Sequence, residues 1–431
     1  MLSSLELSTK GGHSLGNELE IERLDHVAIT EWTPTTATEL GRIVSENFQN
    51  EKHPFSPVGG RTAINQSSDS SPEMIHLLTS QLNRVVDYPS RDMTITVEAG
   101  IRIEALQEIL REKNQRLPID IPQAGRASLG GAIAANVSGP SRYGYGTFRD
   151  YVIGITAVDG QGRLFSAGGK VVKNVAGYDL CKLLIGSRGS LATITEVTLK
   201  LRPLSEANAI VLAAFEPEKP LEPILAELNK SATRPVVLDL LNPKAAWHLN
   251  GEANQKLPDG KNLLWIEFAG TTSEVSWQAS TVQEEVQKHQ PTEILVIETE
   301  EYQPSHDALV EFRTTSDDPL TFHASFPKSR SQEFLTLATE HEIALQIHAG
   351  NGVAYGHLPD RCTTSSTANE MLRPFRDLAE SSGGGLTILN SDPEWSSEIE
   401  SAAQRNQARD LMQGIKKTLD PANLMSPGLF L

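Results

Sequence analysis

The chain has 431 residues, of which 39 % are hydrophobic and 22 % are charged, and its formal net charge is -17. This composition is that of a folded globular protein, and the length predicts about two or three domains. The acidic balance argues against duplex nucleic acid or an anionic membrane as the main partner. It leaves room for a local anion site, because backbone N–H groups bind phosphate without any net positive charge.

Cysteine usage and the lack of long apolar segments indicate a cytoplasmic protein. Cys181 and Cys362 lie far apart and show no zinc or C-x-x-C spacing, which favours a reducing compartment. Residues 1–25 are polar and contain no apolar core of a secretory signal. The longest apolar run, 209–215, is far shorter than the ~20 residues of a membrane helix. We therefore expect a cytoplasmic chain that would reach the periphery of the inner membrane only through a partner.

Apolar spacing predicts the elements of the first half of the chain. Residues 34–44 begin with turn and N-cap chemistry and continue with helical spacing. Alternation of apolar and polar residues predicts strands, and one-sided apolar spacing predicts helices. Strands are expected over 93–97, 152–158 and 191–201, and a second helix over 103–114.

Residues 205–235 are rich in Pro and Glu and indicate a domain boundary. Beyond it, strands are expected over 263–268, 294–297 and 344–347, and helices over 272–288, 331–341 and 399–418. The predicted organisation is a polar lead-in over 1–25, a first domain over 26–206 and a second over 207–431.

Glycine is concentrated in two stretches of the first domain, 125–146 and 168–189. Because glycine costs backbone entropy, such clusters need a reason. The simpler reason is a series of tight turns, and the more specific one is close approach of the backbone to a phosphate-bearing ligand. Neither a Rossmann G-x-G-x-x-G nor a P-loop is present, and His341-Glu342 lacks the second His of H-E-x-x-H. The chain is therefore not an obvious NAD enzyme, kinase or zinc protease.

Four glycine-containing motifs occur in a fixed order. They are P-V-G-G-R-T at 57–62, S-L-G-G-A-I-A-A-N-V-S-G at 128–139, R-Y-G-Y-G-T-F-R-D-Y-V-I-G at 142–154, and the pair K-N-V-A-G-Y-D-L at 173–180 and G-S-R-G-S-L-A-T-I-T-E at 186–196. Together they resemble the PCMH-type FAD-binding domain of the vanillyl-alcohol oxidase superfamily, over about residues 28–206. The resemblance implies an α+β fold, in which a PCMH-type FAD-binding domain of two subdomains precedes an α+β FAD-linked oxidase C-terminal domain.

The resemblance also implies which residues hold FAD. The cofactor-binding candidates are Gly59, Gly60, Arg61, Thr62, Ser128, Leu129, Gly130, Gly131, Asn136, Gly139, Arg142, Gly144, Val152, Gly189 and Ile194. The loops at 59–62 and 128–131 would offer clustered N–H groups and hydroxyls to the pyrophosphate. The strand from Val152 would offer its backbone edge to the adenine or the flavin ring. Residues 132–135 are equally expected to form a helix packed closely on a sheet.

Arg61 departs from the family pattern, which has a third glycine at this position. A non-glycine residue in a left-handed conformation costs about 1–2 kcal/mol. Either the loop is less strained in this chain, or the Arg61 side chain compensates by placing its charge near the pyrophosphate. The loop has no His to form a covalent flavin link, so we expect noncovalent FAD.

The sequence of residues 168–179 resembles that of the smaller FAD-binding subunits of glycolate oxidases. The segment K-K-T-L-D-P-A-N-L-M-S-P-G at 416–428 resembles the C-terminal end of FAD-linked oxidases. A helix that ends before Pro421 explains this tail equally well. Catalytic members of the branch carry H-x-G-D-G-N-x-H, whereas this chain has Asn351 and Tyr355 in place of the acid and the second His. Metals prefer carboxylate and imidazole ligands, so we expect no metal and a structural role for His348. No catalytic residue is assigned.

Three functions remain open. The first is an FAD-binding subunit of a glycolate oxidase complex, which would oxidise glycolate to glyoxylate. Its partners would be a flavin subunit resembling D-2-hydroxy-acid dehydrogenases and an iron–sulfur subunit. The second is a stand-alone FAD-dependent oxidase or dehydrogenase of another small alcohol or hydroxy acid. The third is a scaffold without flavin, against which the intact glycine loops argue.

Overall fold

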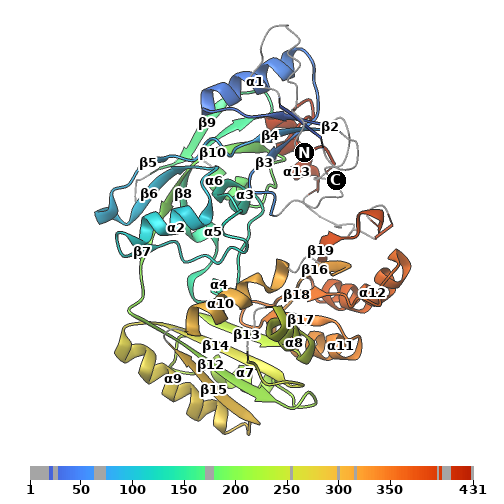
Figure 1. The fold of residues 1–431 in the computed structure, drawn as a ribbon. Coiled ribbons are helices and arrows are strands. Elements are labelled where there is room, and N and C mark those ends of the chain that lie inside the picture. The colour runs from blue at the N-terminus through green and yellow to red at the C-terminus, as the bar shows by residue number, and fades with distance from the viewer. Residues whose placement is uncertain are drawn as a thin grey trace, which may run out of the picture.

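The structure is a computed structural model of the whole chain. It describes residues 19–22, 28–62, 74–169, 179–252, 256–298, 301–314, 318–395, 398–399 and 409–428. The predicted lead-in over 1–25 lies outside these residues except for one short strand, β1 (Leu19–Glu22). Figure 1 shows two groups of elements, with the first half of the chain in one and most of the second half in the other.

The N-terminal domain contains a small four-stranded sheet and a five-stranded sheet. The small sheet has the order β1-β2-β4-β3, and the larger one has the order β5-β6-β10-β8-β9. The small sheet adds β2 (Ala28–Trp32), β3 (Phe55–Val58) and β4 (Ile75–Leu78) to β1. The larger one consists of β5 (Val85–Asp87), β6 (Thr94–Glu98), β8 (Val152–Asp159), β9 (Leu164–Gly168) and β10 (Ala192–Lys200).

Helices and short elements join these sheets. Helix α1 (Ala37–Gln49) begins after Thr36, whose side chain accepts a hydrogen bond from the Glu39 N–H, and buries Leu40 and Val44. The remaining elements are α2 (Ile103–Arg111), β7 (Gln115–Arg116), α3 (Leu129–Ala134), α4 (Arg142–Tyr145), α5 (Phe148–Tyr151), α6 (Leu180–Leu184), β11 (Arg202–Pro203) and the 3-10 turn η1 (Ser90–Asp92). The strands and helices predicted for this half are therefore confirmed to within a few residues.

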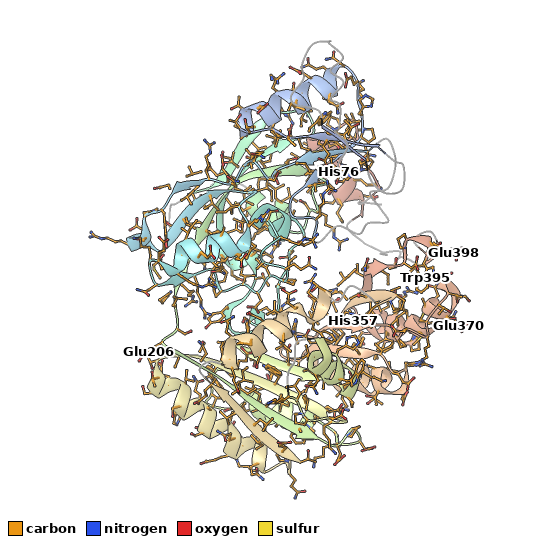
Figure 2. All side chains as sticks on the ribbon, viewed as in Figure 1. His76, Glu206, His357, Glu370, Trp395 and Glu398 are labelled. Atoms are coloured by element: carbon orange, nitrogen blue, oxygen red, sulfur yellow. The ribbon has the colours of Figure 1, made fainter. Side chains whose placement is uncertain are left out.

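The C-terminal domain is built on one eight-stranded sheet with the order β15-β12-β14-β13-β17-β18-β16-β19. Its strands are β12 (Ala207–Phe215), β13 (Val237–Leu241), β14 (Asn262–Gly270), β15 (Glu293–Glu298), β16 (Leu320–Ser325), β17 (Ala344–His348), β18 (Val353–His357) and β19 (Gly385–Ser391). The first strand of this sheet, β12, begins at Ala207, inside the stretch 205–235 that the sequence marks as a boundary. Figure 2 labels the residue before it, Glu206.

The two faces of this sheet are covered differently. One face packs against α7 (Glu222–Leu228), α9 (Thr272–Gln287), α11 (Ser331–Glu340) and α12 (Ser365–Ser381) in a large apolar core. The other face packs against α8 (Pro243–Glu252) and α10 (Tyr302–Glu311) in a smaller core that also includes Tyr145 of the first domain. Within the described residues, the domain also contains the 3-10 turns η3 (Phe312–Thr314), η4 (Lys328–Arg330) and η5 (Pro393–Trp395).

The last helix, α13 (Arg409–Leu419), returns to the first domain (Figure 1). It overlaps the helix predicted over 399–418 but begins later within the described residues. No helix in the described parts of the chain combines the length and the hydropathy that a bilayer-spanning segment needs.

A buried group of charges joins the two domains. The His306 ring, on α10, lies between two carboxylates: Nδ1 is 2.9 Å from Glu267 Oε2, and Nε2 is 3.3 Å from Asp120 Oδ1 in the first domain. Glu267 is fully buried and also accepts hydrogen bonds from the Trp265 indole and the Tyr302 hydroxyl, both at 2.8 Å. Burial alone would lower the pKa of His306, but the two carboxylates raise it well above 6.5.

We predict that His306→Gln destabilises the protein in a pH-dependent way. Removing one partner of a buried ion pair costs about 3–5 kcal/mol. Because the folded-state pKa of His306 is raised, its contribution is fully present below its ordinary pKa of 6.5 and is lost as the pH rises through the folded-state value. Denaturant unfolding of both proteins between about pH 5 and pH 10 should therefore show a free-energy difference that shrinks toward high pH.

His289→Gln is the matched control for this prediction. His289 also lies 2.8 Å from a carboxylate, that of Glu227, but both side chains of this pair reach solvent. An exposed pair contributes about 0–1 kcal/mol. A loss in His306→Gln that is the same at every pH would contradict a charged His306.

Candidate functional site

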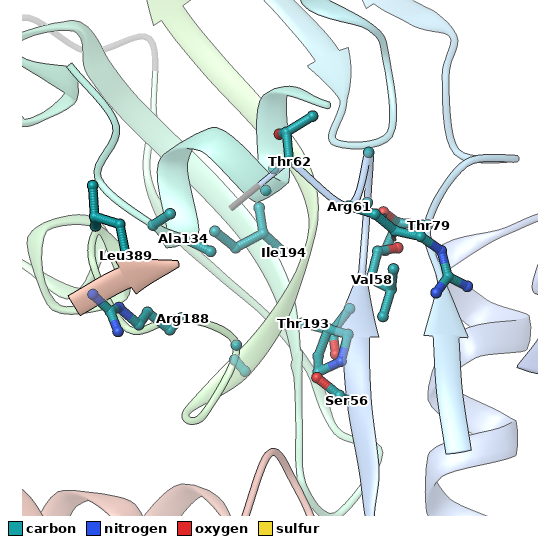
Figure 3. A pocket seen from close by; sticks show the side chains of 18 of the residues that line it. Ser56, Val58, Arg61, Thr62, Thr79, Ala134, Arg188, Thr193, Ile194 and Leu389 are labelled. Atoms are coloured by element: carbon teal, nitrogen blue, oxygen red, sulfur yellow. Dashed lines mark hydrogen bonds between the residues drawn. The ribbon is translucent and has the colours of Figure 1, made fainter. Parts of the chain in front are cut away.

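A cavity with about 1000 Å³ of empty space, part of it open to solvent, lies where the glycine loops of the first domain meet. Figure 3 shows its walls. One wall is the end of β3 and the following loop, 56–62; a second is α3 with residues 130–135; a third is the start of β10 with the preceding loop, 188–194. Residues 388–389 on β19 close it from the C-terminal domain. The cavity is thus shared by both domains.

Eight of the residues implied by the family resemblance line this cavity. They are Gly59, Gly60, Arg61, Thr62, Gly130, Gly131, Gly189 and Ile194. Ser128 stands directly behind them: its hydroxyl accepts a hydrogen bond from the Gly131 N–H at 3.2 Å and thereby caps α3. The motifs that are separate along the sequence thus meet at this cavity, and their role in binding FAD stays a prediction.

The glycines of the first loop are needed for packing between loops. A Cβ atom on Gly60 would lie 1.9 Å from the Arg126 carbonyl oxygen, and one on Gly59 would lie 1.9 Å from the Ser128 hydroxyl. Gly131 differs, because a Cβ there would meet only the Ser128 hydroxyl, at 3.0 Å, and the rest of a side chain would enter the cavity. Gly59 and Gly60 therefore allow the loops to pack closely, whereas Gly131 keeps cavity space free of a side chain.

The remaining implied residues lie outside the cavity lining. Leu129 is fully buried in the core of the first domain, and Asn136 is exposed with a left-handed φ of 50°. Gly139 packs on Asp120, and Gly144 packs on Val236 of the second domain. Arg142 also lies outside the lining and donates to the Ser138 hydroxyl at 3.2 Å. That these positions bind the cofactor, as the resemblance implies, stays a prediction.

The strand that starts at Val152 does not offer a free edge to a ligand. From Gly154 to Val158, β8 is paired with β10 on one side and with β9 on the other. Val152 itself is buried and pairs with Leu199. The expected backbone contact to adenine or flavin at this strand is therefore not available along 154–158.

Arg61 is the clearest correction to the sequence-based expectation. Its φ of 56° is left-handed, so the loop does carry the strain that a third glycine would avoid. Its guanidinium donates to Glu31 Oε1 at 2.6 Å, and its other terminal nitrogen is 3.2 Å from the His76 ring. Figure 3 shows this side chain directed away from Ile194 and Ala134. Arg61 thus contributes its backbone to the cavity, while its charge pairs with Glu31.

Arg188 and Thr193 are lining residues that the sequence analysis did not name. Arg188 has a left-handed φ of 50°, and its N–H donates to the Ala134 carbonyl at 2.8 Å. Thr193 is buried, and its hydroxyl has no hydrogen-bond partner. Both lie within the motif G-S-R-G-S-L-A-T, which is the signal that could have found them. Ile388 and Leu389 carried no such signal, because only the fold brings them to the first domain.

The lining suits an anionic cofactor with a flat apolar part. In the described part of the chain, the lining includes Arg188 and Arg61 but no Asp or Glu, although the chain carries a net charge of -17. Backbone loops and hydroxyl groups can hold a pyrophosphate, and Ile194, Ile388 and Leu389 offer apolar contacts. The described lining contains no His, Cys or Tyr for a covalent flavin link. The motif stretch 173–178 lies outside the described residues.

A polar stripe crosses the sheet of the second domain on the face covered by α8 and α10. His348 Nδ1 lies 2.8 Å and 2.9 Å from the two carboxylate oxygens of Asp239, and the Gln346 amide also donates to Asp239 at 2.8 Å. All three residues are buried. The opposite ring nitrogen, His348 Nε2, is buried without a hydrogen-bond partner. A carboxylate that fixes one nitrogen of a His while the other stays available is the arrangement of a proton acceptor.

Arginine side chains lie near this polar stripe. Arg313 lies over the Tyr355 ring at 4.8 Å, and its guanidinium donates to the Tyr355 hydroxyl at 3.3 Å. Burial and the positive charges of Arg313, Arg142 and Arg188 lower the pKa of His323 to about 3, so His323 is neutral at physiological pH. His323 pairs across the sheet with Thr387, the neighbour of Ile388 in the cavity wall. Of the three arginines that act on His323, Arg188 itself lines the cavity.

The described residues contain no group of three or more His, Cys, Asp or Glu side chains that could hold a metal ion. The Tyr355 ring lies edge-on to the His348 ring, with 5.5 Å between the ring centroids.

Comparison with known proteins gives matches to two protein families, each over part of the chain. Residues 32–168 match the family described as "FAD binding domain", and residues 402–429 match "FAD linked oxidases, C-terminal domain". The chain is 25 % identical over 414 residues to "Glycolate oxidase subunit GlcD" of Bacillus subtilis (strain 168), an alignment that covers 92 % of this chain and 87 % of that one. It is 31 % identical over 187 residues to "Glycolate oxidase subunit GlcE" of Escherichia coli (strain K12), covering 43 % and 48 %.

A solved structure shows the same fold. The structure titled "alkyldihydroxyacetonephosphate synthase in P212121" superposes with a TM-score of 0.66 at 17 % sequence identity, and the match covers 93 % of this chain and 77 % of that one. The fold is thus the expected α+β arrangement, a PCMH-type FAD-binding domain followed by an FAD-linked oxidase C-terminal domain. The protein is an FAD-dependent oxidoreductase, and its cofactor is FAD.

We predict that Gly131→Val removes FAD binding while the protein stays folded. The valine side chain would occupy cavity space, so the Kd for FAD should rise at least about tenfold, which is 1.4 kcal/mol. Titration of apo-protein with FAD measures the Kd, and thermal unfolding of the apo-protein should show a nearly unchanged Tm.

Gly60→Ala is the contrasting variant. Its new methyl group would press on the Arg126 carbonyl, and such overpacking costs about 1–3 kcal/mol of stability. Full FAD affinity in Gly131→Val would show that the cofactor does not occupy this cavity.

We also predict opposite results for the two arginines of the cavity. Arg188→Met should weaken FAD binding about tenfold to a hundredfold, because a hydrogen bond to a charged group contributes about 1.5–3 kcal/mol. Arg61→Gly should change the Kd less than about threefold, since its charge is paired with Glu31 and glycine relieves the backbone strain. The same apo-protein titration measures both. A large loss in Arg61→Gly together with none in Arg188→Met would place the pyrophosphate beside Arg61.

Proposed function

We propose that the chain is the FAD-binding subunit of a glycolate oxidase-type enzyme. It oxidises glycolate, or a similarly small 2-hydroxy acid, to the 2-oxo acid and passes the electrons to a partner iron–sulfur subunit. The observation that carries this proposal is the group of arginines, Arg313, Arg142 and Arg188, around His323, of which Arg188 lines the cavity. A small carboxylate is the kind of substrate that such cations bind.

Each residue of the polar stripe has a role in this proposal. Arg313, held by the Tyr355 ring and hydroxyl, binds the substrate carboxylate. His348 accepts the proton of the substrate hydroxyl at Nε2, and Asp239 holds the ring in the tautomer that leaves this nitrogen free. FAD, when bound, accepts the two electrons and the hydrogen from the α-carbon. Buried Gln346 keeps Asp239 in place.

The role as a subunit rests on the relatives and on cysteine chemistry. Two relatives carry names of glycolate oxidase subunits, GlcD and GlcE. The two cysteines of this chain are both buried and far apart in sequence, whereas an iron–sulfur cluster needs about four thiolates. Electrons from the flavin would therefore leave to another protein. A flavin subunit resembling D-2-hydroxy-acid dehydrogenases is the other expected partner.

A second candidate is a stand-alone FAD-dependent oxidase or dehydrogenase of another small alcohol or hydroxy acid. The observation in its favour is that this chain has its own candidate base, His348, and its own carboxylate-binding arginine. The two functions differ in what the purified chain does alone, because a stand-alone enzyme turns over with a simple electron acceptor and a dependent subunit does not.

The purified protein should be yellow, and acid precipitation should release its FAD into the supernatant. Under anaerobic conditions, glycolate or D-lactate should bleach the visible absorption of the flavin. Arg313→Met should lower kcat/KM for reduction about tenfold to a hundredfold, because it removes a charge-assisted hydrogen bond of about 1.5–3 kcal/mol. Stopped-flow reduction of the flavin measures this loss.

Arg330→Met is the matched control, because Arg330 pairs with Glu333 on the surface and should leave the rate unchanged. Equal reduction by an alcohol without a carboxylate, or an unchanged rate in Arg313→Met, would contradict the proposed substrate class.

A further inference from the structure

The C-terminal tail carries a buried lysine that is not used in the proposed chemistry. Lys416 Nζ donates three hydrogen bonds, each 2.7 Å long, to Asp420 Oδ2, the Met425 carbonyl and the Ser190 carbonyl. An ammonium group has three donors, so all of them are used. Burial lowers the pKa of Lys416, which the Asp420 carboxylate counteracts.

Asp420 arranges the turn that follows the helix. It is buried, and its two carboxylate oxygens accept the N–H groups of Leu424 and Met425 at 3.0 Å and 2.8 Å. Asp420 thus fixes the backbone from 420 to 425, and Lys416 holds both ends of this turn.

This turn is joined to the strand that carries the first cavity wall. The Phe55 N–H donates to the Leu424 carbonyl at 2.8 Å, and the Ser426 N–H donates to the Phe55 carbonyl at 2.7 Å. The hydroxyls of Ser56 and Ser426 are 3.2 Å apart. Residues 424–426 therefore extend the small sheet next to β3, which runs directly into the cavity loop 59–62.

The third bond of Lys416 reaches the opposite cavity wall. Ser190 is fully buried and follows Gly189, whose Cβ position lies 3.2 Å from the Pro57 ring. The loop 187–190 and the end of β3 are therefore in contact beside the cavity. One ammonium group is linked to the first wall through the turn 420–426 and to the other wall through the Ser190 carbonyl.

We propose that Lys416 is a positioning residue for FAD binding: with Asp420, it fixes the loops 57–62 and 187–193 against each other, so the C-terminal segment is a structural part of the cofactor site. The inference concerns binding of FAD and is independent of which substrate the enzyme oxidises. On this proposal, the pattern K-x-x-x-D-P at 416–421 positions the cofactor loops in addition to ending the helix.

The test is titration of apo-protein with FAD for Lys416→Met, with Lys417→Met as the control. Lys417 is the next residue on the same helix and is exposed. Lys416→Met should raise the Kd for FAD at least tenfold, and Lys417→Met should leave it within twofold. Hydrogen exchange of the two apo-proteins should be faster in segments 55–62 and 187–193 of Lys416→Met only.

Asp420→Asn is the second variant, because it removes the charge and keeps the side-chain volume. If Lys416→Met does not fold, Asp420→Asn takes its place, and its Kd for FAD should also rise at least tenfold. Wild-type affinity in a folded Lys416→Met or Asp420→Asn variant would overturn the proposal. Loss of folding in both, with Lys417→Met intact, would also overturn it, because the contact would then be needed for folding alone.

Discussion

The structure is organised around the need to hold a strongly anionic cofactor in a protein that is itself acidic. The chain meets this need locally, by building the cavity from backbone loops and hydroxyl groups and by keeping Asp and Glu out of its described lining. Gly59 and Gly60 allow one loop to pack against the residues before α3, with no room for a Cβ atom. That close contact fixes the loop that forms the first wall of the cavity.

The eight-stranded sheet supplies the second half of the site. Both of its faces pack against helices in apolar cores, and the face covered by α8 and α10 also carries the buried polar side chains of Asp239, Glu267 and His348. Such groups are stable in the interior only when they are paired. Asp239 and Glu267 each have several donors, whereas His348 Nε2 has none. Of the Asp239–His348 pair and Glu267, the atom without a partner, His348 Nε2, is thus the one that the proposed chemistry uses.

The sequence predicted the elements well and named several residues that line the cavity, because both depend on local patterns. Apolar periodicity located the helices and strands, and the order of the glycine motifs located Gly59, Gly131 and Gly189. The sequence did not predict contacts between residues that are far apart along the chain. The partner of Arg61 is Glu31, which no motif contains, and β8 is covered on both edges by strands that the periodicity of β8 cannot reveal. The neutral His323 and the Asp239–His348 pair emerge only when separate strands align.

Asn136, Gly139 and Gly144 show the limit of reading function from a motif. They belong to the same motif runs as Gly131, yet they support turns and the contact between domains. A motif records every position that the fold needs, and only the three-dimensional arrangement separates those that face the ligand from those that hold it in place.

The most direct test of the account is a crystal structure of the purified protein with FAD. The account predicts electron density for FAD inside this cavity, with the pyrophosphate within hydrogen-bond distance of the Arg188 guanidinium and the flavin on the side that β19 closes. FAD bound at another place, or a cavity filled by side chains in the FAD complex, would contradict it.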